Sequence, residues 1–301
     1  MTPRATGLIL LLLTALGWGS NWPMLKLLLV EMPPLAARSW AGLAAAMLFA
    51  AGAWALRIPL RVPRRLWGRL AVASLLNVTA WMGFATLGLT WLATSEAAIL
   101  AYTMPVWTVL LAWPVLGERP TRQRVVGLAL GLASIGVLFA GRGLELGLAK
   151  WPGMALVLAA ALLFALGAVL AKRFPLPMHP AAAVTWQVGL GCLPLWLLSL
   201  VIEEVRWAAI SPQGWFFLGW MALVALGLAY LSWFGALARL PAPTATLGTL
   251  LTPVVGVLGA GLFLGEPLGL REWAALGCTL AGVALAVGGA PPGMRADEEP
   301  R

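Results

Sequence analysis

The sequence predicts an all-α integral membrane protein whose ten transmembrane helices form two inverted repeats of five helices. Three observations predict this fold. Of the 301 residues, 61% are hydrophobic and only 10% are charged, whereas soluble domains carry about 25% charged residues. The apolar residues gather in ten runs, each close to the roughly 20 residues that a helix needs to cross a bilayer. Rare residues also recur at a nearly constant spacing in the two halves of the chain.

The ten runs are separated by loops that are too short to form a further domain. We predict transmembrane helices at residues 7–29, 35–56, 67–89, 94–116, 124–141, 152–171, 181–201, 213–235, 244–264 and 273–289. The first run is longer than the apolar core of a signal peptide and no cleavage motif follows it, so we expect it to remain as the first helix. The Pro-rich, charged tail at 291–301 is expected to be a disordered cytoplasmic segment.

Residues 1–147 and 148–290 are predicted to be related copies. At a spacing of 146 residues Lys26 matches Lys172, Pro34 matches Pro180 and Trp40 matches Trp186, and at 148 residues Pro105 matches Pro253 and Gly117-Glu118 matches Gly265-Glu266. Each copy holds five helices, an odd number, so the second copy enters the membrane from the opposite side. Inverted repeats are the architecture of many secondary transporters, whose binding site lies near the midplane between the repeats.

The lysines and arginines indicate the orientation of the helices. If the N-terminus is cytoplasmic, 14 of them lie on the cytoplasmic side and 5 on the external side, with Arg38 left out because it lies inside the second run. Cytoplasmic loops carry an excess of basic residues. We therefore expect a multi-pass protein of the plasma (inner) membrane with both termini in the cytoplasm. The net charge of +9 then reflects topology and not nucleic-acid binding.

Motifs at corresponding positions of the two halves carry a resemblance to a known family. They are Trp18-Gly19-Ser20-Asn21 with Lys26 and Arg38, Thr103-Met104-Pro105 with Leu116-Gly117-Glu118-Arg119, and Thr252-Pro253 with Leu264-Gly265-Glu266-Pro267. In the order and spacing of these motifs the sequence resembles the drug/metabolite transporter superfamily, in its ten-helix EamA-like exporter branch, over nearly the whole chain. The resemblance implies an inverted five-plus-five repeat and the export of small metabolites.

Within that family, the sequence is most similar to bacterial amino-acid exporters, including those for aromatic amino acids. The first-half Trp-Gly-Ser-Asn motif is replaced in the second half by Phe164-Ala165-Leu166-Gly167. Any binding site is therefore expected to be asymmetric.

Polar and aromatic side chains deep in the apolar runs are the candidates for substrate binding. Asn77 and Trp81 are four residues apart and share a helix face, and an amide beside an indole suits an amphipathic organic solute better than an ion. Tyr102 and Tyr230 lie mid-run, where a buried hydroxyl needs a partner; they line the pathway or bond one helix to another. The predicted substrate-binding residues are Trp18, Asn21, Asn77, Trp81, Tyr102, Phe164, Tyr230 and Thr249. We expect the first, third, fourth, sixth, eighth and ninth helices to line the pathway and the fifth and tenth to brace it.

Two prolines and three charged residues complete the predicted site. Pro105 and Pro253 fall near the middle of their runs, where each removes a backbone donor and bends the helix. They are predicted gating hinges; a packing kink without function gives the same pattern. Lys26, Arg38 and Glu96 fall near the outer ends of their runs and predict an outer vestibule for a charged or zwitterionic solute. For Lys26, snorkelling to the membrane surface is the alternative.

The predicted function is transport by alternating access, and two other classes stay open. An intramembrane enzyme would need a catalytic motif, but the single histidine, His179, lies in a loop and no H-E-x-x-H or G-x-S-x-G motif occurs. No catalytic residues, metal or cofactor are therefore expected. A carrier of nucleotide sugars or sugar phosphates on the same fold would need several deep cations.

The energy source and the partners follow from the same residues. Glu96 is the only acidic residue within a predicted run, so we expect transport without strong proton coupling. The expected partners are the lipid bilayer and a small-molecule substrate, an amino acid or a related amphipathic metabolite. We expect no nucleic acid and a monomeric protein.

Overall fold

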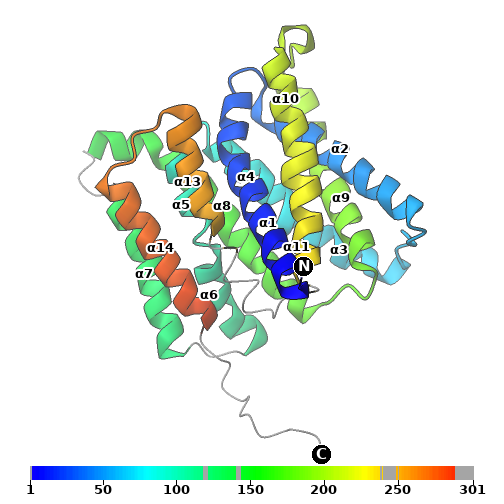
Figure 1. Ribbon diagram of the computed structural model, residues 1–301, viewed down its shortest axis with the longest axis horizontal. Helices are drawn as coiled ribbons and strands as arrows, with labels where there is room; N and C mark the ends of the chain where they lie inside the picture. The colour runs from blue at the N-terminus through cyan, green and yellow to red at the C-terminus, as the bar shows by residue number, and fades with distance from the viewer. Residues whose placement is uncertain are drawn as a thin grey trace, which may run out of the picture.

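The computed structural model describes residues 2–117, 121–139, 144–237, 239, 249 and 251–288 (Figure 1). Across these ranges the chain is helical and contains no strand. Within them, seven helices are long and apolar enough to span a bilayer, and the apolar helices Val125–Val137 and Leu251–Leu264 are shorter. The prediction of an all-α membrane fold with about ten helices is therefore confirmed. The predicted tail at 291–301 lies outside the described residues.

Continuous helices account for most of the predicted spans. They are α1 (Pro3–Leu28), α2 (Pro34–Ala55), α7 (Arg122–Phe139), α8 (Leu144–Arg173), α9 (Pro180–Ile202) and α14 (Leu270–Gly288). α13 (Leu251–Leu264) covers the second part of the predicted span at 244–264, whose first part lies outside the described residues except for Thr249. The start of α8 differs from the prediction, because the helix begins eight residues before the predicted run at 152–171. Hydropathy marks only the apolar part of a helix, whereas the helical backbone hydrogen bonds continue through more polar residues. The predicted boundary after residue 147 lies in the first turns of α8.

Among the spans that the structure describes from end to end, three consist of shorter pieces. The third is η1 (Arg64–Leu66), α3 (Trp67–Ser74), the π-helical segment η2 (Leu75–Ala80) and α4 (Trp81–Gly88). The fourth is α5 (Thr94–Ala101) and α6 (Met104–Leu116). The eighth is α10 (Pro212–Trp220), the π-helical segment η4 (Met221–Leu228) and α11 (Ala229–Leu237), and the short helix η3 (Trp207–Ala209) lies in the loop before it. The two π-helical segments begin 146 residues apart, which is the spacing of the repeats. Such segments interrupt regular helices and are frequent at functional sites.

The helices of the two repeats pack in a pattern that is unchanged when the repeats are exchanged. α2 packs on α9 and α7 packs on α14, so each of these helices contacts its own counterpart. α1 packs on α13 and α11, and its counterpart α8 packs in the same way on α6 and α4. In Figure 1 the α7–α14 pair lies at one side of the bundle and the α2–α9 pair at the other, with α1 and α11 between them. This exchange symmetry is that of two repeats related by a two-fold axis.

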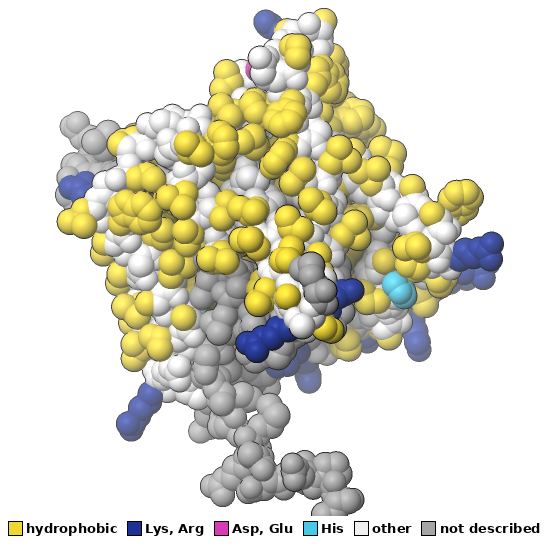
Figure 2. Space-filling model, in the orientation of Figure 1, with side chains coloured by type: hydrophobic (Ala, Val, Ile, Leu, Met, Phe, Trp, Pro, Cys, Tyr) yellow, Lys and Arg dark blue, Asp and Glu magenta, His cyan; other side chains and the backbone are white. Residues whose placement is uncertain are grey.

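The outside of the bundle is predominantly apolar, as a bilayer requires. Leu12 and Leu16 on α1, Val201 on α9 and Leu262 on α13 are exposed examples. Figure 2 shows hydrophobic side chains over most of the visible face and basic side chains mainly toward the end where α1 begins. We name that end proximal, and the opposite end, where α1 finishes, distal.

The largest buried core lies in the distal half of the bundle. It includes Leu25 and Leu28 on α1, Leu89 directly after α4, and Leu100 on α5. None of these four side chains is more than 1% exposed. This packing separates the middle of the bundle from the distal surface.

Candidate functional site

A central cavity of about 440 Å³ lies between the two repeats. Ligand sites for small organic molecules have volumes of roughly 300–1,000 Å³, so the cavity has the size of a metabolite site. Its walls combine aromatic rings, aliphatic side chains and a few polar groups. The lining residues are Trp18, Asn21, Trp22, Arg38, Asn77, Val78, Trp81, Met82, Tyr102, Met104, Phe164, Ala225, Leu226, Tyr230, Trp233, Thr249, Thr252, Pro253, Thr279, Leu280 and Val283. All eight residues predicted to bind substrate therefore surround one cavity, and their role in binding stays a prediction.

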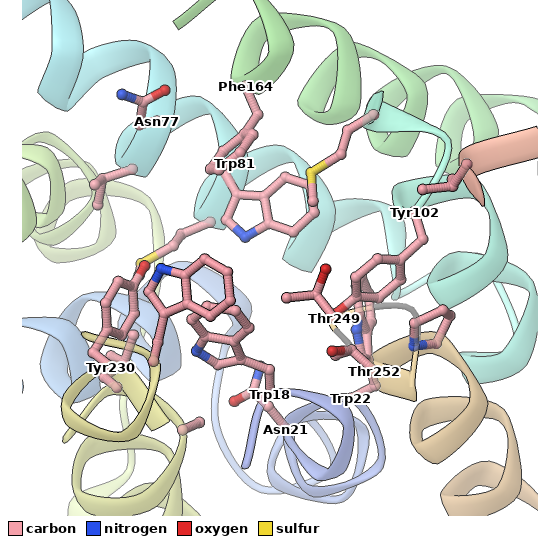
Figure 3. A pocket seen from close by; sticks show the side chains of 18 of the residues that line it. Trp18, Asn21, Trp22, Asn77, Trp81, Tyr102, Phe164, Tyr230, Thr249 and Thr252 are labelled. Carbon is pink, nitrogen blue, oxygen red and sulfur yellow. The ribbon is translucent and has the colours of Figure 1, made fainter. Parts of the chain in front are cut away.

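Two aromatic pairs stand at opposite sides of the cavity. The rings of Trp18 and Tyr230 meet edge to face with their centroids 5.4 Å apart, and those of Trp81 and Phe164 lie 5.1 Å apart. Figure 3 shows Trp81 and Phe164 across the open space from Trp18, with Tyr230 to the side. Trp18 and Phe164 occupy corresponding positions in the two repeats, 146 residues apart. One ring of each pair therefore occupies a corresponding position in the two repeats, whereas the second rings, Tyr230 and Trp81, do not stand at that spacing.

The π-helical segments place one ring of each pair. Trp81 follows η2 directly, and Tyr230 lies in the first turn after η4. A π-helical turn holds an extra residue, so it rotates the side chains that follow it relative to a regular helix. Both rings line the cavity, although hydropathy gives no signal for either segment.

A polar cluster at the cavity wall is formed by Asn21 and Arg38, which line the cavity, and by the fully buried Thr86, which does not. Arg38 is only 6% exposed, and its Nε donates to the hydroxyl of Thr86 at 3.0 Å. When the Asn21 amide oxygen faces the guanidinium, Nη1 and Nη2 both lie 3.2 Å from it. The sequence predicted an outer vestibule position for Arg38; the structure instead places it in the cavity wall. The reason is that a charged residue one turn inside a membrane helix turns toward the bundle interior, away from lipid.

The other two residues of the predicted vestibule, Lys26 and Glu96, lie at the distal end and do not line the central cavity. Lys26 Nζ donates to the carbonyl oxygens of Leu89 at 2.5 Å and Leu92 at 2.9 Å. Glu96 is 1% exposed and its carboxylate lies 2.7 Å from Lys150 Nζ. Both charges are held by protein groups, and the predicted role in admitting solute stays untested.

Three carboxylates join the two repeats at the distal end by capping helix N-termini. Glu203 accepts from the backbone N–H groups that begin α2, at 3.0 and 2.8 Å. Glu31 accepts from Ser211 N at 2.6 Å, directly before α10. Glu266 accepts from Thr94 N at 2.6 Å, at the start of α5. A carboxylate at a helix N-terminus makes charge-assisted hydrogen bonds and is favoured by the helix dipole. With the buried distal core, these caps close the distal end.

The two predicted hinge prolines lie at helix starts. Pro105 is the second residue of α6, and the interruption at Tyr102 and Thr103 precedes it. Pro253 is the third residue of α13 and lines the cavity. Proline is favoured at such positions because the first N–H groups of a helix have no partner within the helix. The fourth span is thus broken and not only bent, and the gating role stays a prediction.

Several lining residues were missed by the sequence reasoning. Trp22 lies one turn after Trp18 on the same face of α1, so an i, i+4 pattern could have found it. Thr279 on α14 lines the cavity, which corrects the expectation that the tenth helix only braces the bundle. Its hydroxyl, the single one in the predicted run at 273–289, was the available signal.

A second cavity of about 550 Å³ lies between α3, α8 and α9, toward the proximal end. Its walls include Arg69, Phe174 and Gln187. Asn77 Nδ2 donates to Gln187 Oε1 at 3.4 Å. Asn77 lines the central cavity and Gln187 lines the second one, so this hydrogen bond joins a wall residue of one cavity to a wall residue of the other.

Comparison with known proteins agrees with this architecture. Residues 5–140 and 151–288 each match the EamA-like transporter family. The chain belongs to the EamA-like transporter family. The two matches confirm the two repeats of the EamA fold and, with the helices described above, a multi-pass membrane transporter.

Two distant relatives of this EamA protein match most of its length. The uncharacterized transporter YvbV of Bacillus subtilis is 28% identical over 278 residues, 91% of this chain and 89% of that protein. The uncharacterized inner membrane transporter YedA of Escherichia coli K12 is 29% identical over 270 residues, 89% of this chain and 86% of that protein. A protein of known crystal structure has a TM-score of 0.67 with 21% identity, covering 94% of this chain and 96% of its own. That likeness concerns the fold alone.

Proposed function

We propose that this EamA-family transporter exports small amphipathic organic solutes, most of all amino acids with aromatic or large apolar side chains. The observation that carries the proposal is the central cavity, which has aromatic pairs on opposite sides and few polar groups, among them the Asn21 amide and the Arg38 guanidinium. Stacking and apolar contact favour a ring or branched chain, and the amide and guanidinium favour a polar head. An inorganic ion would find few ligands in such walls.

Alternating access is the proposed mechanism. The distal end is closed by the buried core and the carboxylate caps, while the cavity lies at the interface between the repeats. Rocking of one repeat against the other would open the distal end around a solute held at this interface. We place the proximal end in the cytoplasm of the inner-membrane protein, because exposed arginines such as Arg61, Arg64 and Arg65 gather there.

The alternatives draw less support from the cavity. A carrier of sugar phosphates needs several cations around its ligand, and Arg38 is the one cationic side chain among the described residues of the wall. An intramembrane enzyme is disfavoured by membership of a transporter family. The described wall contains no carboxylate or histidine, which supports transport without strong proton coupling.

Counterflow in proteoliposomes tests the proposal. Vesicles loaded with unlabelled tryptophan, phenylalanine, leucine, glutamate or a sugar phosphate receive a trace of the same labelled solute outside. We expect transient accumulation of tryptophan, phenylalanine and leucine, and little of glutamate or sugar phosphate. Ala225→Trp, which fills the cavity from the wall that Ala225 lines, is expected to abolish the signal. Failure of all three apolar amino acids to exchange in the wild type would overturn the proposed function.

A further inference from the structure

Arg38 is the one point at which α2 reaches the central cavity. It lies one turn inside the helix, and no other residue of α2 lines the cavity. The side chain is 6% exposed and is surrounded by the membrane part of the bundle. Within the described part of the chain, no carboxylate forms an ion pair with it. A buried charge of this kind is costly unless it is paired.

The protein partners of Arg38 position the guanidinium but do not neutralise it. The hydroxyl of Thr86 accepts from Nε, and the amide oxygen of Asn21 accepts from Nη1 and Nη2. Both acceptors are uncharged. A guanidinium has five N–H groups, so one N–H on each terminal nitrogen is left without a protein acceptor in these contacts. The side chain is therefore fixed in direction and still able to bind an anion.

The rest of the cavity offers apolar surface next to this cation. Trp18 and Tyr230 form one wall and Trp81 and Phe164 another. The described lining contains no carboxylate that could meet an ammonium group. A solute with a carboxylate and an apolar body thus finds a partner for both parts, whereas an amine finds only aromatic faces and neutral oxygens.

We propose that Arg38 is the anion subsite of the cavity and that it binds the carboxylate of the transported solute. The inference rests on the proposed function and narrows it. The substrate class is monocarboxylates with an aromatic or large apolar body, and the α-ammonium of an amino acid is dispensable. Asn21 and Thr86 act as positioning residues for the guanidinium.

The test is a matched series of competitors in tryptophan counterflow. Indole-3-propionate keeps the ring and the carboxylate but lacks the ammonium, tryptophan amide lacks the charge of the carboxylate, and tryptamine lacks the carboxyl group. Charge-assisted hydrogen bonds to Arg38 should favour competitors with a carboxylate over those without one. In wild type we therefore expect the inhibition constants of tryptophan and indole-3-propionate to lie within a few-fold of each other. Tryptophan amide and tryptamine should have inhibition constants at least about tenfold higher than those of the two carboxylates.

Variants then assign the discrimination to Arg38. In Arg38→Gln the carboxylates should lose about tenfold or more in potency while the amide and the amine keep theirs, and Arg38→Lys should retain part of the preference. Arg61→Gln, which removes an exposed arginine outside the cavity, is the matched control and should behave as wild type. The wild-type series requires no variant, so it stands even if Arg38→Gln misfolds.

The outcomes separate the two proposals. Tryptophan counterflow with equal inhibition by tryptamine, the amide and indole-3-propionate would overturn the anion subsite and leave the proposed function standing. A carboxylate preference that survives in folded Arg38→Gln would also overturn it. Absence of counterflow for every amino acid would overturn the proposed function together with the inference built on it.

Discussion

At the scale of single residues, the aromatic rings of the cavity are the groups whose removal should affect transport most directly. Trp81 pairs with Phe164 and faces Trp18 across the open space (Figure 3). We expect Trp81→Ala to raise the half-saturation constant for tryptophan by about three- to tenfold. The reason is that a contact between the Trp81 ring and the ring of the solute would contribute roughly 0.5–1.5 kcal/mol beyond the area it buries. Initial rates of exchange in proteoliposomes measure this constant.

The control for this substitution is Trp54→Ala. Trp54 lies at the end of α2, away from the cavity, and is 82% exposed, so its loss should leave the constant unchanged. Tyr102→Ala, on another wall of the same cavity, should weaken transport as Trp81→Ala does. Unchanged kinetics in both cavity variants, with normal insertion into the membrane, would remove these residues from the site.

The sequence predicted where the site residues lie along their helices better than which way their side chains point. Asn77 and Trp81 were found because polar groups are conspicuous in apolar runs, and both line the cavity. Arg38 was placed by its distance from the helix end, although the rotation of α2 about its axis decides what it touches. That rotation depends on the packing of α2 against α9, which no local pattern in the sequence reports.

At the scale of helices, glycines decide how closely two axes approach. A Cβ at Gly19 on α1 would lie 2.5 Å from Val255 Cβ and 2.8 Å from the carbonyl oxygen of Thr252, both on α13. Gly52 on α2 has no such neighbour within 4 Å. We expect Gly19→Ala to lower the thermal stability in detergent, since the α1–α13 contact must open.

Gly52→Ala is the matched control and should be neutral or stabilising, by up to about 1 kcal/mol, because alanine favours a helix. Scanning fluorimetry or the loss of the monodisperse peak on heating compares the two variants. Equal melting temperatures would show that α13 yields at this point and that the close approach is not needed.

The carboxylate caps predict a second property of the helices. Glu203 accepts two N–H groups at the start of α2, whereas its neighbour Glu204 is exposed. Loss of a cap costs about 0.5–2 kcal/mol, so Glu203→Gln should raise the population with an open distal end about fivefold for a loss of about 1 kcal/mol. Leu28 is fully buried in the distal core, so a cysteine placed there reports opening of the distal end. In a background in which Cys192 and Cys278 are replaced by alanine, Leu28→Cys should react faster with a maleimide when the distal end opens more often.

Glu204→Gln should leave the labelling rate as it was, because Glu204 is an exposed carboxylate of the same loop. If the maleimide labels Leu28→Cys at the same rate in the Glu203→Gln and Glu204→Gln variants, the Glu203 cap does not hold the distal end closed.

Hydropathy predicted the helices well and their irregularities not at all. The apolar run at 67–89 was visible, but η2 within it was not, because a π-helical turn changes the hydrogen-bond register and not the composition. The break after Ala101 was partly foreseen from Pro105, since proline cannot donate to the ladder. The caps by Glu31, Glu203 and Glu266 could not be foreseen, because each joins residues more than 160 positions apart.

At the scale of the whole molecule, the orientation in the membrane is open to direct measurement. Arg64 lies at the proximal end and Arg206 in a distal loop, and both are exposed. From the excess of basic residues at the proximal end, we expect a membrane-impermeant maleimide to label Arg206→Cys in intact cells. Arg64→Cys should react only after the cells are permeabilised. Labelling of Arg64→Cys in intact cells would contradict the cytoplasmic placement of both termini.

The coupling of transport to protons is a second property of the whole molecule. Glu96, the acidic residue within the predicted runs, is paired with Lys150 and accepts from Ala93 N at 3.0 Å, so it serves the distal end and not the cavity. We expect no uphill accumulation of tryptophan in proteoliposomes under an imposed pH gradient with the membrane potential clamped. Accumulation that disappears in a stably folded Glu96→Gln would instead make Glu96 a proton site.

The closed distal end also has a consequence for the two faces of the membrane. When a face is open for only a fraction of the time, its apparent dissociation constant is the intrinsic constant divided by that fraction. If transport follows the proposed alternating access, the distal core and caps should raise the half-saturation constant on the distal face relative to the proximal face. For a carrier that moves one solute and nothing else, detailed balance requires the same ratio of maximal rate to half-saturation constant on both faces. In the proposed mechanism the caps would set the concentration range in which each face works, and for a zwitterionic amino acid the solute gradient would set the direction of net flow.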